Sequence, residues 1–149
     1  MRVVIQRVRS SKVTVDDKVI GEIDKGLMVL VGISREDSTK DCDYIIDKLI
    51  NLRIFTDSDD KMNLSAKDIN AEVLVVSQFT LYGDVRHGRR PSFTQSASSE
   101  DGKVLYDYFC DRISTQGLKV AFGEYGADML VDIQNDGPVT ILLDSQKLF

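Results

Sequence analysis

The sequence contains few of the residues on which common hydrolase and metal sites depend. It has one histidine, His87, and two cysteines, Cys42 and Cys110, which are far apart in the chain. Paired Cys/His spacing is missing, so neither a zinc site nor a disulfide framework is expected, and both cysteines are interpreted as small buried apolar residues. A catalytic triad would need His87 as its base, but a histidine in a loop among arginines is more often solvated.

The familiar motifs of serine-hydrolase and nucleotide-binding sites are also missing. There is no Gly-x-Ser-x-Gly elbow, no P-loop and no dinucleotide-binding glycine pattern. No apolar segment approaches the roughly 20 residues that cross a bilayer. Residues 1–6 lack the long apolar stretch of a signal peptide. We therefore expect no membrane partner and a cytoplasmic location.

Charge restricts how this chain could bind nucleic acid. The formal net charge is −5, whereas a protein that coats nucleic acid is basic. Any such contact must therefore be local. Arg86, Arg89 and Arg90 place three guanidinium groups within five residues, and the planar donor fork of arginine matches phosphate oxygens. As a single feature this is a weak signal, because short basic loops are common, but it is the predicted site for a polyanion.

Hydrophobic patterning along the 149 residues predicts one domain of the α+β class. Apolar or alternating stretches indicate strands at 3–8, 12–15, 19–23, 27–33, 73–76, 118–122, 129–133 and 139–143, with a short further strand at 53–55. Apolar residues at helical spacing, after serine-containing caps, indicate amphipathic helices that begin near Ser38 and Ser98. We expect residues 1–149 to form packed, largely antiparallel β-sheets with both helices on one side, in β/β/α layers.

The best polar group for a site follows the apolar run 73–76, which is typical of a strand buried on both faces. It consists of Ser77, Gln78, Phe79 and Thr80, which a rigid strand would hold in place. If the chain turns there, the backbone N–H groups point together into a cavity; if the strand continues, Gln78 and Thr80 share one face. By spacing alone, ordinary polar residues at a strand end are the favoured interpretation.

A second stretch, residues 135–140, interrupts two apolar segments near the end of the chain. Its central step is Gly137-Pro138, and the chain has only one other proline, Pro91. A tight turn and a bulge at a sheet edge both explain such a step. A cis bond occurs in only about 5–6% of X-Pro steps. Spacing alone favours a structural turn.

Taken together, these motifs resemble those of the D-aminoacyl-tRNA deacylases. The resemblance rests on residues 77–81, 90–93 and 135–140, and extends to 5–8, 13–15, 53–55, 61–64 and 105–109. It covers the whole chain in order, and the combination is far more specific than any one stretch. It therefore outweighs the interpretations that spacing alone favours.

The resemblance implies an enzyme that removes D-amino acids wrongly esterified to tRNA, and also glycine from mischarged tRNA. It implies a homodimer, with tRNA as substrate and without a metal or organic cofactor. It also implies a pocket built across the subunit boundary, which the Ser77–Leu81 stretch of one chain lines with the catalytic residues Ser77, Gln78, Phe79 and Thr80. By the same resemblance, Gly137 and Pro138 of the other chain are expected to enter that pocket with a cis peptide and to select the substrate. The family often has a small residue where this chain has Tyr82, so we expect a different pocket rim.

Two mechanisms follow from this assignment. Backbone donors near Phe79 and Thr80 could stabilise the oxyanion while the neighbouring ribose 2′-hydroxyl orients or activates water. Alternatively, Thr80 could be the nucleophile, but it lacks an evident base. We favour the substrate-assisted route, with the arginine loop contacting the tRNA acceptor stem. A non-catalytic RNA-binding module and a metal-dependent esterase are the alternatives from other classes.

Overall fold

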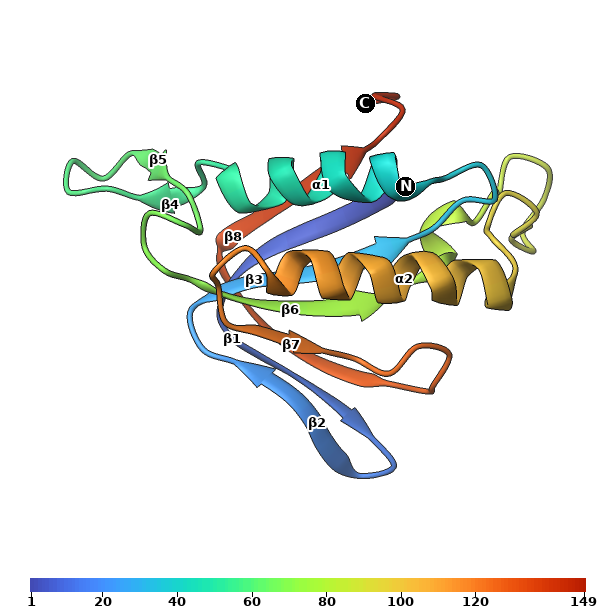
Figure 1. Cartoon of the computed structure of the whole chain (residues 1–149), viewed down its shortest axis with the longest axis horizontal. Coiled ribbons are helices and arrows are strands. Elements are labelled where there is room, and N and C mark those ends of the chain that lie inside the picture. The colour runs from blue at the N-terminus through green and yellow to red at the C-terminus, as the bar shows by residue number, and fades with distance from the viewer.

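One long strand organises the computed structural model, which describes residues 1–149 (Figure 1). This strand, β1 (Arg2–Val15), pairs antiparallel through its first half with β3 (Gly26–Gly32) and through its second half with β2 (Lys18–Ile23). Along its other edge β1 pairs with β8 (Leu130–Asp144), which follows it over both halves. The antiparallel part of the fold is therefore built around β1.

Parallel pairing extends the sheet beyond β3. β6 (Glu72–Ser77) pairs with β3, and β7 (Val120–Phe122) pairs with β6. The connections carry α1 (Thr39–Asn51) and α2 (Ser99–Ser114), as parallel strands require a crossover. The larger sheet is therefore mixed, and its strand order is β2-β1-β3-β6-β7 with β8 beside β1.

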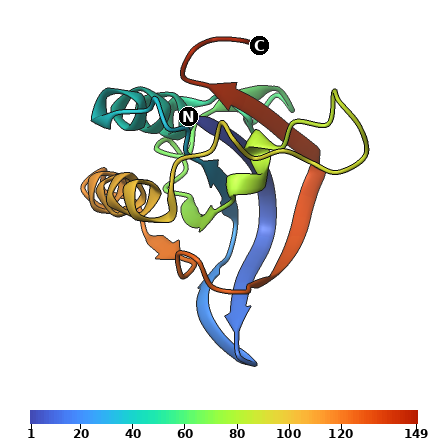
Figure 2. The ribbon, with the colours of Figure 1, turned by 90° about the vertical axis from the view of Figure 1, so that its right-hand side faces the viewer.

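Both helices lie on one side of this sheet (Figure 2). The α1 helix is preceded by Ser38, whose backbone N–H donates to Asp41 at 2.9 Å, and α2 is preceded by Ser98, whose hydroxyl accepts from the Asp101 N–H at 3.1 Å. A cluster of 22 buried residues joins the helices to the sheet. A second cluster of six buried residues lies on the opposite face, so the α+β prediction with helices on one side is confirmed.

β3 and β6 take part in both clusters. Leu27, Val29, Val73 and Val75 point to the helices, whereas Met28 and Leu74 belong to the smaller cluster. Every residue of 73–76 is buried, as its apolar composition predicts. A separate two-stranded sheet, β4 (Phe55–Thr56) and β5 (Met62–Leu64), extends away beyond the end of α1 (Figure 1).

The structure corrects two predictions about strands. Residues 3–8 and 12–15 belong to one continuous strand, because Ser11 is buried and its hydroxyl donates to the Asp132 carbonyl at 2.7 Å. Residues 129–133 and 139–143 likewise belong to one strand, β8, so Gly137-Pro138 is not a turn. Proline lacks an N–H, and an edge strand with register shifts against β1 tolerates that loss.

No helix of the chain has both the length and the apolar character needed to cross a membrane.

Candidate active site

The chain turns sharply where β6 ends. After Ser77 it enters a short 3₁₀ helix, η1 (Phe79–Tyr82). The Gln78 N–H donates to the Val31 carbonyl of β3 at 2.8 Å, which fixes the start of the turn. Gly32 lets η1 lie directly on β3, since a Cβ there would be 3.0 Å from the Gln78 oxygen. The alternative in which the chain turns after the strand is therefore the correct one.

This turn leaves two backbone donors free. The first N–H groups of any helix precede its first intrahelical hydrogen bond. In η1 that first bond runs from the Leu81 N–H to the Gln78 carbonyl at 3.3 Å. The N–H groups of Phe79 and Thr80 come before it and donate to no side chain. They are available to a ligand at the end of a strand buried on both faces.

A cavity of about 750 Å³ opens beside these donors. Its walls are mostly apolar and come from three parts of the chain: the ends of β3 and β6, the segment from Phe93 to Ser99, and the segment from Tyr125 to Val131. The Phe79 ring, 56% exposed, meets the Phe93 ring edge to face at 5.0 Å between centroids. A cavity of this size and composition suits an organic group with an aromatic ring.

The predicted catalytic residues are only partly brought together in this cavity. Ser77, Gln78 and Phe79 line it, whereas Thr80 lies outside its lining. The Thr80 hydroxyl accepts a hydrogen bond from Gln78 Nε2 at 2.5 Å, and this is its only partner. A side-chain amide does not take up a proton at neutral pH, and His87 is exposed in its loop. Thr80 therefore has no base to activate it.

Gly137 and Pro138 do not line the cavity of their own chain. They lie exposed in β8, and the peptide bond between them is cis. Arg7 anchors this segment from β1: its Nε donates to the Asp136 carbonyl at 2.9 Å and its Nη1 to the Ile54 carbonyl at 2.6 Å. Within one chain, the two predicted halves of the pocket are separate.

In the arginine loop, which contains Arg86, Arg89 and Arg90, one arginine forms an ion pair and two do not. Arg86 donates to both carboxylate oxygens of Asp84 at 2.9 and 2.7 Å. This contact holds the pKa of the Asp84 carboxyl well below its usual range. Arg89 and Arg90 are exposed and form no ion pair. Of the three predicted tRNA contacts, these two are free to meet a phosphate.

Tyr82, Cys42 and Cys110 do not line the cavity beside η1. Tyr82 is buried and lies outside the lining of the cavity in its own chain, so its effect on the rim of a pocket shared by two chains stays a prediction. Cys42 is buried and Cys110 half-buried, both are free, and burial raises the pKa of each thiol to about 12. Neither is a thiolate at neutral pH.

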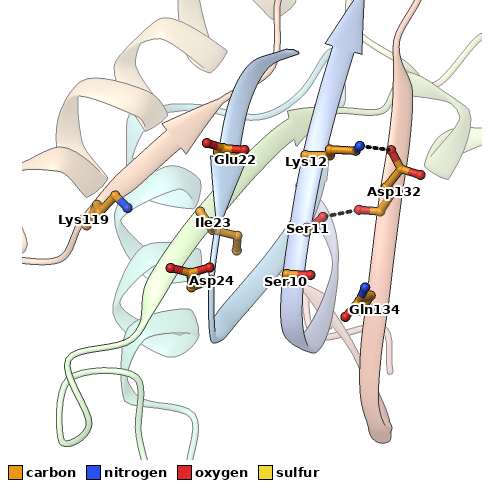
Figure 3. Close-up of a pocket in the computed structure, with 9 residues that line it drawn as sticks. All are labelled: Ser10, Ser11, Lys12, Glu22, Ile23, Asp24, Lys119, Asp132 and Gln134. Atoms are coloured by element: carbon orange, nitrogen blue, oxygen red, sulfur yellow. Dashed lines mark hydrogen bonds and ion pairs between the residues drawn. The ribbon is translucent and has the colours of Figure 1, made fainter.

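A different cavity, of about 410 Å³, lies between β1, β2 and β8 (Figure 3). It is polar: Lys12 of β1 and Asp132 of the neighbouring strand β8 pair at 3.7 Å on one side, and Glu22 and Asp24 lie on the β2 side. None of the predicted site residues lines it. Nowhere in the chain do three or more His, Cys, Asp or Glu side chains form a group that could hold a metal ion.

Sequence reasoning missed two contributors to the site. One is the segment from Tyr125 to Met129, which forms a wall of the cavity. The glycine at 126 signals a turn there, but nothing local places that turn beside Phe79. The other is Arg7, whose long-range contacts with Asp136 and Ile54 appear only in three dimensions.

Comparison with known proteins identifies the family of this chain. The family model described as D-Tyr-tRNA(Tyr) deacylase matches residues 4–144. The chain is 57% identical to a D-aminoacyl-tRNA deacylase of Thermotoga petrophila and 59% identical to one of Clostridium beijerinckii, and both alignments cover the whole of both chains. The class is thus that of hydrolases acting on aminoacylated tRNA. Within it, this chain belongs to the D-aminoacyl-tRNA deacylase family, a family of proofreading enzymes.

Solved structures show the same fold. The c-Myc DNA Unwinding Element Binding Protein gives a TM-score of 0.92 at 39% identity, covering 97% of this chain and 98% of that chain. A probable eukaryotic D-amino acid tRNA deacylase gives a TM-score of 0.81 at 22% identity, covering 95% of this chain and 97% of that one. The full-length matches to curated hydrolases favour the enzyme over a non-catalytic RNA-binding module.

Proposed function

We propose that the cavity beside η1 is where this deacylase hydrolyses the ester between a D-amino acid and the terminal adenosine of tRNA. Water attacks the ester carbonyl carbon, and the negative charge that forms on the oxygen is bound by the N–H groups of Phe79 and Thr80. The bond to the ribose oxygen then breaks and that oxygen takes up a proton. The observation that carries this proposal is the pair of free donors at the start of η1, the first of which belongs to the cavity-lining residue Phe79.

In this proposal the substrate assists its own hydrolysis. An aminoacyl ester is already activated, and the ribose 2′-hydroxyl next to it can orient or activate the attacking water. The rival mechanism, with Thr80 as nucleophile, needs a base, and the only partner of its hydroxyl is the Gln78 amide. The geometry therefore favours the substrate-assisted route. The mostly apolar walls suit the adenine base of the substrate.

Selection against L-amino acids is assigned to Gly137 and Pro138 of a second copy of the chain in a homodimer. Both residues are exposed and lie outside their own cavity, so they are free to enter another one. Arg7 holds the Asp136 carbonyl, which limits movement of the segment. The backbone carbonyl oxygens of the Gly137-Pro138 segment accept hydrogen bonds from the substrate ammonium group. They also occupy the space that the side chain of an L-amino acid would need. Glycine has no side chain to block, so glycyl-tRNA is also hydrolysed.

The tRNA acceptor stem is assigned to the arginine loop. Arg89 and Arg90 present unpaired guanidinium groups beside η1 in the sequence, whereas Asp84 partly neutralises Arg86. A local basic loop on a chain of net charge −5 restricts the contact to one face of the protein. Because charged tRNA is the substrate, we place the enzyme in the cytoplasm.

The decisive test removes one proposed donor. In Phe79→Pro the backbone N–H is lost, and Pro is tolerated at the first position of a helix. Gln78 has φ −148° and ψ 82°, which lies outside the α region that a following proline disfavours. Phe79→Ala is the matched control, because it also loses the ring but keeps the N–H.

Single-turnover hydrolysis of D-Tyr-tRNA should be slower in Phe79→Pro than in Phe79→Ala by about 10²–10³-fold, the usual cost of one oxyanion donor. Far-ultraviolet circular dichroism of both variants verifies the fold. Equal rates in the two variants would show that the Phe79 N–H does not bind the oxyanion, and the proposed site would be wrong.

A further inference from the structure

Arg2 lies behind η1, on the side away from the cavity lining. It is the first residue of β1 and pairs with Asp144, the last residue of β8. Its Nε donates to Asp144 Oδ2 at 3.1 Å, and its Nη1 donates to the Leu81 carbonyl at 3.3 Å. Its guanidinium carbon lies 4.7 Å from the centroid of the Tyr82 ring. One side chain therefore connects the end of β8 to the last two residues of η1.

The partners of Arg2 are themselves fixed. The Asp144 side chain is only 2% exposed, and its second oxygen accepts the Gln146 N–H at 2.7 Å. Tyr82 is buried, and its ring lies 3.4 Å from where a Cβ on Gly32 would be. A buried carboxylate needs a charged partner, so Arg2 is held in place from the β8 side. A neighbouring cavity of about 470 Å³ keeps the Arg2 side chain partly accessible.

η1 needs such external support because it is short. Its outer hydrogen bonds run from the Leu81 N–H to Gln78 and from the Gly83 N–H to Thr80, at 3.3 and 2.9 Å. Helices of the 3₁₀ type have poor hydrogen-bond geometry and rarely hold their shape alone. The start of η1 is fixed by the Gln78 bond to β3. Its end is fixed by Arg2, through the Leu81 carbonyl and the Tyr82 ring.

We propose that Arg2 is a positioning residue for deacylation, which holds η1 so that the Phe79 and Thr80 N–H groups point at the oxyanion. The inference rests on the proposed role of those two donors. Arg2 itself lines the cavity behind η1 and not the one that receives the substrate. Its effect on the reaction therefore passes through the orientation of the helix, not through contact with the substrate.

Arginine is suited to this position and lysine is not. The planar fork donates to a carboxylate and a carbonyl in different directions while its face covers an aromatic ring. A lysine ammonium is a single point and can satisfy Asp144 or the Leu81 carbonyl, but not both together with the ring. Arg2→Lys is therefore a conservative variant that keeps the charge and loses the link.

The experiment measures kcat and KM for D-Tyr-tRNA in Arg2→Met and Arg2→Lys. Arg112→Met is the matched control, because Arg112 pairs with Asp43 at the same 3.1 Å but joins the two helices far from η1. In Arg2→Met, kcat should fall about tenfold to about a hundredfold, with KM unchanged, since misplacing a catalytic group costs rate and not affinity. Arg2→Lys should be intermediate, and Arg112→Met should match the wild type.

A second arm separates positioning from general weakening of the fold. In a Phe79→Pro background, where the donor is already absent, Arg2→Met should cause a clearly smaller further loss of kcat. An undiminished loss in that background, or a wild-type kcat in Arg2→Met, would overturn the inference. If Arg2→Met does not fold, Arg2→Lys and Tyr82→Leu carry the same test. If Phe79→Pro and Phe79→Ala hydrolyse D-Tyr-tRNA at the same rate, the oxyanion proposal itself has failed. If Phe79→Pro is slower but the Arg2 variants keep the wild-type kcat, only the positioning role has failed.

Discussion

The two predicted halves of the pocket occupy opposite kinds of strand. The η1 segment follows β6, a strand with neighbours on both edges and buried side chains on both faces. Gly137 and Pro138 lie in β8, which has β1 on one edge and no strand on the other. The first segment is complete within its own chain, with a cavity and free donors. The second is presented outward, which is the arrangement expected of a part that serves a neighbouring copy.

A mixing experiment tests most directly whether the two predicted halves of a pocket come from different chains. Phe79→Pro damages the η1 half, and Gly137→Ala damages the β8 half. At Gly137 the φ angle is +134°, and an added Cβ would lie 2.9 Å from Arg7 Nη2. If the halves come from different chains, a mixed dimer contains one pocket with two intact halves. Refolding the two variants together should then restore roughly a quarter of the wild-type rate.

The measurement is D-Tyr-tRNA hydrolysis by each variant alone and by the refolded mixture. Each parent alone should be slower by about 10²-fold, the scale of a lost oxyanion donor or a misplaced group. The control mixes each variant with itself under the same conditions. A mixture no faster than the mean of its parents would place both halves in one chain.

A smaller effect on activity is expected when Gly137 and Pro138 are kept but the Arg7 contacts that hold their segment are removed. Arg7 is 12% exposed and donates to two carbonyl oxygens, those of Asp136 and Ile54. Arg7→Met leaves both unsatisfied, which costs about 1–3 kcal/mol of stability each. The ratio of kcat/KM for D-Tyr-tRNA over L-Tyr-tRNA should fall about tenfold, because a mobile barrier rejects less well. An unchanged ratio in a destabilised variant would mean that Arg7 serves the fold alone.

The arginine loop should affect binding more than chemistry. Replacing Arg89 and Arg90 with alanine removes two unpaired cations and should reduce the slope of log K against log salt by about 1.4–1.8, at about 0.7–0.9 per phosphate contact. Arg86→Ala is the control within the loop, because Asp84 already neutralises that guanidinium. Titrations of tRNA at several salt concentrations measure the slope. The same slope in all three proteins would place the tRNA contact elsewhere.

The smallest effect is expected at Thr80. Its hydroxyl is bound to the Gln78 amide and has no base, so Thr80→Ala should keep substantial turnover of D-Tyr-tRNA. The backbone N–H survives this substitution. A rate near background, with tRNA binding and the fold intact, would instead identify Thr80 as the nucleophile.

The fold class was predictable because its signals are local. The run 73–76 is uniformly apolar and forms a strand buried on both faces, and both helices begin beside the serines that mark their caps. The strand boundaries of β1 and β8 were not predictable. The polar residue Ser11 suggests the end of a strand, but it is buried and its hydroxyl donates to the Asp132 carbonyl of β8. Pro138 suggests a turn, but it lies within the edge strand β8. In both cases a distant part of the chain decides the outcome.

Sequence reasoning could select candidate residues for the site but could not predict how they are arranged. Ser77, Gln78 and Phe79 meet at one cavity, but spacing could not choose between a continued strand and a turn. The choice depends on Gly32 and Val31 of β3, more than forty residues earlier. Tyr82 shows the same limit, since spacing could not predict that its ring packs against Arg2 from the start of the chain.

The burial of β3 and β6 on both faces has a consequence for how the enzyme responds to heat. Local opening is easiest where few apolar contacts must be broken. η1 is attached to the ends of two strands that contribute to both hydrophobic clusters. The start of η1 is therefore attached to a part of the molecule where local opening must break many apolar contacts. We therefore expect the start of the proposed catalytic turn to open no more easily than β3 and β6, whereas Gly137 and Pro138 lie exposed in β8 and depend on Arg7 for their position.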